Sequence, residues 1–197
     1  YDYQNLSNVD NIYVYQFYLF DDVSAYGTNS IPDKKIYYIS IIKNNDKDIK
    51  ISLNGYLNSE KLNYTYYING MRISIVRKDV YYDHVEYVFN INNMNNENVV
   101  FKYDNAYLTV SNSSRSYTFN NTKHVLSYIF INSHQEKEIK LSFEKSFDAT
   151  KVKENFIKIE NLYLLDEEAF NKLMSNEMSI NQLSESNYIT NDIELGL

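Results

Sequence analysis

The chain has 197 residues, of which 44% are apolar and 16% aromatic, enough for a hydrophobic core in one large β-domain or two small ones. Its formal net charge of −7 argues against nucleic acid and against an anionic membrane surface as direct partners, because both attract basic patches. Cysteine is absent, which excludes disulfides and thiolate metal sites, and no apolar run reaches the roughly eighteen residues of a membrane helix.

The first part of the chain reads as short strands. Residues 12–20 (IYVYQFYLF) are apolar on both faces, which is typical of a buried central strand. A loop is predicted at 21–34, with Gly and Pro as breaks in the pattern. Strands are then predicted at 36–42 and 49–53, and the second alternates apolar and polar residues, as in a sheet with one solvated face.

An Asn-Gly hairpin is the strongest local signal in the sequence. Asn69-Gly70 separates two alternating runs, and a two-residue type I′ turn requires the positive φ that both residues tolerate. The hairpin is expected to direct Met71, Ile73 and Ile75 toward the core.

Beyond the hairpin, short strands alternate with connections rich in Asn and Ser. Strands are predicted at residues 85–91, 99–103, 106–110, 117–119, 138–143, 156–165 and 188–195. One segment has helical spacing: Asp166 is a suitable N-cap, and Phe170, Leu173 and Met174 form one apolar stripe, which predicts a short helix near 167–176. The pattern predicts a mainly β fold, an antiparallel, jelly-roll-like β-sandwich with one short helix.

One β-turn-β unit occurs twice. Residues 45–53 read NDKDIKISL and residues 135–143 read QEKEIKLSF, so that a charged turn leads into a similar strand in both copies. The full copies span about 34–53 and 124–143, and we expect them to form similar hairpins at equivalent sheet positions. We interpret 1–197 as a single β-sandwich region, with two packed sub-sandwiches as the alternative.

The sequence gives little support to a catalytic site. The histidines His84, His124 and His134 are scattered, and no pattern of a serine hydrolase, metalloprotease or P-loop occurs. A glycosidase needs two carboxyl groups on either side of one bond, which neighbours such as Glu167 and Glu168 rarely supply; this pair suits the helix dipole. We therefore predict no catalytic residue, no metal site and no cofactor.

Two clusters of acidic and aromatic residues in predicted loops are candidates for glycan binding. Carboxylates accept hydrogen bonds from sugar hydroxyls, and aromatic faces stack on sugar rings. The alternatives are a solvated loop for the first cluster and rings that cap a tyrosine-rich core for the second. The predicted binding residues are Asp21, Asp22, Tyr26, Tyr81, Tyr82 and His84.

The C-terminal stretch carries a resemblance to a known family. Residues 161–195 show a strand that ends in Tyr-Leu-Leu-Asp, an acidic-capped helix with Phe and Leu on one face, and then a segment with spaced Leu, Ser and Ile. This stretch resembles the C-terminal extracytoplasmic region of the YfhO family of bacterial membrane proteins, although Asn191 stands where the family usually has Gly. The matching positions are Tyr163, Leu164, Leu165, Asp166, Phe170, Leu173, Ile180, Leu183, Ser184, Ser186 and Ile189.

The resemblance implies a parent protein with many membrane helices, similar to GT-C glycosyltransferases that decorate cell-wall polymers from lipid-linked sugars. The catalytic carboxylate of that class lies in a loop between membrane helices. The chain would then be a non-catalytic accessory domain on the extracytoplasmic face of the membrane, beside the parent's helices, that binds a glycan, a cell-envelope polymer or a partner. The alternative is a secreted or surface carbohydrate-binding or adhesin module of a Gram-positive bacterium.

Overall fold

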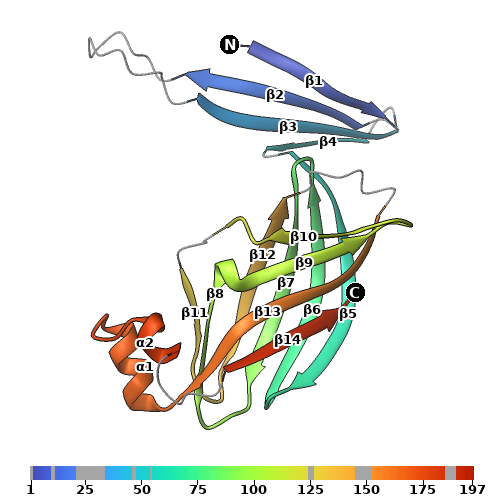
Figure 1. The fold of residues 1–197 in the computed structure, drawn as a ribbon. Helices are drawn as coiled ribbons and strands as arrows, with labels where there is room; N and C mark the ends of the chain where they lie inside the picture. Colours follow the sequence, from blue (N-terminus) through green and yellow to red (C-terminus); the bar gives the residue numbers. More distant parts are fainter. Residues whose placement is uncertain are drawn as a thin grey trace, which may run out of the picture. The chain divides into compact units, whose positions relative to one another are not determined.

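The protein is built almost entirely from antiparallel strands (Figure 1). The contacts divide the chain into two units. Unit 1 comprises Tyr1–Ser59 and Asp79–Asp83, and unit 2 comprises Glu60–Lys78 and His84–Leu197. The computed structural model describes residues 2–9, 12–20, 34–45, 48–53, 55–123, 127–144, 152–184 and 190–197.

Unit 1 contains a four-stranded antiparallel sheet in the order β1-β2-β3-β4. Its strands are β1 (Asp2–Val9), β2 (Ile12–Phe20), β3 (Lys34–Asn45) and β4 (Asp48–Leu53). β2 is paired on both edges, as its continuous apolar run predicts. β1 was not predicted, because Asp, Asn and Ser have low strand propensity; its pairing with β2 outweighs that preference.

Unit 2 is an antiparallel β-sandwich, which confirms the predicted fold class. Its first sheet has the order β12-β7-β6-β5, and we call it the β7 sheet. Its strands are β5 (Tyr56–Ile68), β6 (Met71–Tyr81), β7 (His84–Asn93) and β12 (Glu136–Glu144), of which β5 and β6 continue into unit 1.

The second sheet of unit 2, which we call the β13 sheet, has six strands. The chain crosses between the two sheets from β7 to β8, from β11 to β12 and from β12 to β13. The strands are β8 (Asn98–Lys102), β9 (Ala106–Ser111), β10 (Ser116–Asn120), β11 (Tyr128–Ile131), β13 (Lys153–Leu165) and β14 (Thr190–Gly196).

β13 lies at the centre of the β13 sheet and pairs with β8, β9 and β14. Ile159 pairs with both Ala106 of β9 and Ile193 of β14, so these two strands lie along opposite edges of β13. β8 continues the β9 edge, and the two strands are separated only by the 3-10 turn η2 (Tyr103–Asn105). β13 therefore links the C-terminal strand to the middle of the sandwich.

The core of unit 2 is formed by alternate residues of facing strands. Met71, Ile73 and Ile75 are fully buried, as the hairpin pattern predicts. The turn before them has φ 52° at Asn69 and 69° at Gly70, which confirms the predicted requirement for positive φ. Strands of both sheets complete the core with Val85, Tyr87, Phe89, Ile91, Leu108, Val110, Leu141, Phe143, Ile157 and Ile159.

Two short helices follow β13. The predicted helix is α1 (Glu167–Met174), and its N-cap is Asp166, whose Oδ1 accepts a hydrogen bond from the Ala169 amide at 2.8 Å. The second, α2 (Ile180–Ser184), was not predicted because five residues hold little more than one turn of periodicity. Their buried side chains pack on strands β8 and β13 and include Phe170, Leu173, Ile180 and Leu183, with Val100, Tyr163 and Leu165 beneath.

The two copies of the sequence repeat do not fold alike. The first copy forms the hairpin β3–β4, in which the two strands pair with each other. In the second copy β11 pairs with β8 and β12 pairs with β7, so its two strands belong to different sheets. The expectation of equivalent hairpins is therefore wrong. Similar local sequences form strands in both places, but tertiary packing chooses the partner of each strand.

Candidate functional site

The glycan-binding residues predicted from the first loop lie outside the described part of the chain, and their role stays a prediction. They are Asp21, Asp22 and Tyr26.

The second predicted cluster is divided between the two units. Tyr81 ends β6 in unit 1, where its ring meets the Tyr56 ring edge-on at 5.6 Å between centroids, and Tyr82 follows it. A binding role for Tyr81, Tyr82 and His84 stays a prediction, as does the alternative that the rings cap a tyrosine-rich core. His84 is the first residue of β7 in unit 2.

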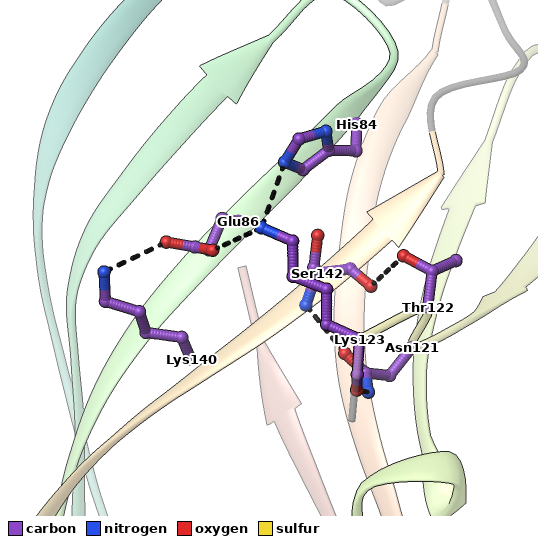
Figure 2. A network of polar contacts seen from close by, with 7 residues as sticks. All are labelled: His84, Glu86, Asn121, Thr122, Lys123, Lys140 and Ser142. Carbon is purple, nitrogen blue, oxygen red and sulfur yellow. Dashed lines mark hydrogen bonds and ion pairs between the residues drawn. The ribbon is translucent and has the colours of Figure 1, made fainter. Parts of the chain in front are cut away.

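His84 belongs to a polar network on strands β7 and β12, shown in Figure 2. Its centre is Glu86, which is only 5% exposed. The Glu86 carboxylate lies between two cations, with Lys123 Nζ 3.0 Å from Oε2 and Lys140 Nζ 3.3 Å from Oε1. Lys123 Nζ also lies 3.5 Å from His84 Nε2. We call these residues, with Asn121, Thr122 and Ser142, the Glu86 network.

The other half of the Glu86 network covers the outer edge of β12. The Ser142 amide donates to Asn121 Oδ1 at 2.7 Å, and the Thr122 amide donates to the Ser142 carbonyl at 2.7 Å. Among the described strands β12 is the last of its sheet, so these backbone groups have no neighbouring strand there to bond. The segment after β10 therefore ties the two sheets of unit 2 together.

The geometry of the Glu86 network favours a structural role. A nucleophilic serine needs a neighbouring base and access for a substrate. Ser142 is 1% exposed, and its hydroxyl has no hydrogen-bond partner among the described residues. The Glu86 charge is compensated by two lysines, as buried charges generally are.

A second polar site lies inside unit 2, where the edge strand β5 meets the ends of β6, β7 and β13. It is a cavity of about 120 Å³, which we call the edge cavity, and its lining combines carboxylates, one lysine and two tyrosines. β5 supplies alternate residues, which point to one face of a strand. The lining residues are Glu60, Leu62, Tyr64, Lys78, Tyr87, Glu154 and Leu197.

An ion pair between the two sheets forms one wall of the edge cavity. Lys78 Nζ on β6 donates to the Glu154 carboxylate on β13, and the side chains are only 16% and 20% exposed. The same ammonium group lies 5.9 Å from the centroid of the Tyr87 ring, within the range of a cation–π contact. Lys78 is thus held by charge on one side and by an aromatic face on the other.

Tyr87 contributes a buried hydroxyl to the edge cavity. The residue is 1% exposed, and its ring packs edge-on against Phe143 at 6.2 Å between centroids. Burial raises the pKa of the Tyr87 hydroxyl, and the negative charge of Glu154 raises it further. Glu154 lies near enough for this effect, yet no group among the described residues meets hydrogen-bond geometry with the hydroxyl.

A tyrosine clasp closes the sandwich beside the edge cavity. The Tyr66 hydroxyl on β5 donates to the carbonyl of Gly196 at the end of β14. Burial, and then the neighbouring Tyr64, raise the pKa of Tyr66, so this hydroxyl remains a donor well above neutral pH. The clasp joins an edge strand of each sheet and positions β5 along the cavity.

Among the described residues, no group of three His, Asp or Glu side chains is arranged to hold a metal ion. Within the same part of the chain, the helices are too short and too polar to cross a membrane. Comparison with known proteins finds no family model that matches the chain and no curated protein that matches it.

Proposed function

We propose that the chain is a glycan-binding accessory domain, not itself catalytic, of a polytopic membrane protein that resembles envelope-polymer glycosyltransferases, and that it lies on the extracytoplasmic face. The edge cavity supports the binding part of this proposal. The resemblance of residues 161–195 to the YfhO family supports the membrane part.

The chemistry of the edge cavity suits a sugar. Glu60 and Glu154 accept hydrogen bonds, Lys78 donates them, and the Tyr87 hydroxyl can do both. Tyr64 is 39% exposed, so part of its ring is available to pack on the apolar face of a sugar ring.

The size of the cavity supports recognition of one part of a larger glycan. Pockets that enclose a whole small ligand are usually about 300–1,000 Å³, whereas the edge cavity measures about 120 Å³. A terminal residue or branch of a polymer would therefore enter it, while the rest of the polymer stays on the surface.

The arrangement supports binding rather than hydrolysis. A glycosidase uses two carboxyl groups on either side of the bond that breaks. In the edge cavity the Glu154 carboxylate is held by Lys78, which leaves Glu60 as the carboxylate without an ion pair among the described lining residues. We expect the purified chain to leave model glycosides intact, and hydrolysis that Glu60→Gln abolishes would contradict this.

A binding experiment with two matched tyrosine variants tests the proposal. Both Tyr64 and Tyr67 lie on β5 and are exposed, at 39% and 72%, but only Tyr64 lines the cavity. Titration of methyl glycosides, followed by nuclear magnetic resonance shifts, should show binding that Tyr64→Ala weakens about tenfold and that Tyr67→Ala leaves unchanged. Equal effects of the two variants, or no binding of any sugar, would refute a glycan site in this cavity.

The membrane part of the proposal has a separate test. The gene that encodes the chain should also encode a series of apolar membrane helices before it. A gene with repeated β-modules and a secretion signal instead would favour the secreted carbohydrate-binding module.

A further inference from the structure

We propose that the edge cavity selects a sugar with a free, protonated amino group over neutral and acidic sugars. This inference rests on the proposed glycan-binding function and specifies its ligand class. Three features of the cavity carry it: the balance of charge in the wall, the placement of Glu60, and the buried hydroxyl of Tyr87.

The wall of the cavity carries an excess of negative charge. Its ionisable side chains at neutral pH are Glu60, Glu154 and Lys78, two carboxylates against one ammonium group. Lys78 is paired with Glu154 across the two sheets. A sugar carboxylate or phosphate would therefore meet a site whose single cation is already neutralised, in a chain of formal charge −7.

Glu60 is placed to receive a cation. It lies on the same face of β5 as Leu62 and Tyr64, and these alternate positions line the cavity. Because a strand rises about 3.3 Å per residue, the row from Glu60 to Tyr64 is roughly 13 Å long. A sugar lying along β5 would place an ammonium group at Glu60 while its ring packs on Leu62 or Tyr64.

The Tyr87 hydroxyl is the third feature of the cavity wall, and the Glu154 carboxylate lies close to it. It is buried and has no hydrogen-bond partner among the described residues. Buried polar groups in folded proteins are almost always hydrogen-bonded, and the exceptions call for a bound molecule or a functional reason. Because burial keeps this hydroxyl protonated, it can donate to a ring or hydroxyl oxygen of the sugar.

The test compares four methyl glycosides on the whole chain at near-neutral pH and low salt: glucosaminide, N-acetylglucosaminide, glucoside and glucuronide. We expect the glucosaminide to bind about fivefold more tightly than the glucoside, the range of a partly exposed ion pair. N-acetylation removes the charge and should return the affinity to that of the glucoside, and the glucuronide should bind most weakly.

Two matched variants separate the role of Glu60 from the net charge of the chain. Glu60→Gln should abolish the preference for the amino sugar, so that the glucosaminide and the glucoside bind with equal affinity. Glu177→Gln removes the same charge at an exposed position after α1 and should leave the preference intact. Equal affinity for glucosaminide and glucoside would overturn this inference while leaving glycan binding in place. Failure of all four sugars to bind would overturn both proposals.

Discussion

The side-chain amide of Asn95 donates a hydrogen bond to the carbonyl oxygen of Asn69 at 2.8 Å. The next bond in the same contact runs from the Met94 amide to the Gly70 carbonyl at 2.9 Å. The connection after β7 thus grips the turn of the β5–β6 hairpin, and the turn is restrained by contacts far along the chain as well as by its own geometry.

Substitution of Gly70 by Val should lower the free energy of unfolding by about 1–2 kcal/mol or more. Gly70 has φ 69°, which a β-branched residue resists, and a Cβ there would lie 1.9 Å from Asn95 Oδ1. Urea denaturation measures the loss. In an Asn95→Ala background the steric part should disappear and the penalty should shrink. A neutral Gly70→Val variant would mean that the turn adopts another geometry.

The Glu86 network should respond asymmetrically to loss of its charges. Glu86→Gln should cost about 1 kcal/mol, because Lys123 and Lys140 are 45% and 49% exposed and can return to water. Changing both lysines to Met should cost about 3 kcal/mol, because the carboxylate is then buried without a cation. The triple variant should recover much of that loss. Equal losses of stability for Glu86→Gln and for the double lysine variant would contradict the buried position of Glu86.

Stability should fall at alkaline pH, and Tyr87 should account for part of the fall. Its pKa is raised above the ordinary 10.0, so its contribution is complete below about pH 10 and is lost as the pH rises toward the folded value. One such group costs about 1.4 kcal/mol per pH unit in that range. The free energy of unfolding of Tyr87→Phe, relative to that of the natural chain, should therefore rise between about pH 9 and about pH 11. A constant difference would show that Tyr87 ionises normally.

Asp166→Ala should destabilise the protein by about 1 kcal/mol. The Asp166 carboxylate accepts the Ala169 amide at 2.8 Å and caps the first turn of α1, whose buried face packs on β8 and β13. Asp166→Asn keeps an acceptor oxygen and serves as the control, with only a small loss expected. The midpoint of thermal unfolding measures both, and an equal loss for Asn and Ala would show that the cap bond does not matter.

Local features of the fold were predictable where neighbours in sequence decide the outcome. The alternation of Met71, Ile73 and Ile75 predicted their burial, and the Asn69-Gly70 pair predicted the turn. The partners of the strands were not predictable, because they depend on packing between distant segments. The second copy of the repeat shows this, because β11 pairs with β8 and β12 pairs with β7, and the two strands of the copy do not pair with each other.

The edge cavity could not be predicted from the sequence, because its lining residues come from distant segments of the chain. Lys78 and Glu154 are 76 residues apart, and no motif connects them. Strand alternation from Met71 would turn residues 77 and 79 inward, whereas Lys78 lines the cavity. Tyr87 is one of 21 tyrosines. Its burial, and its hydroxyl without hydrogen-bond geometry to any described residue, are properties of the folded chain that the sequence does not display.

The cover over β12 by Asn121 and Thr122 has a consequence for how the protein behaves at high concentration. An uncovered edge strand offers its amide and carbonyl groups to another chain and can seed fibrils. Here the amide and the carbonyl group of Ser142, which face away from β7, are already bonded within the molecule. Asn121 and Thr122 thus occupy, at this point of the β12 edge, the backbone groups with which another chain could otherwise pair.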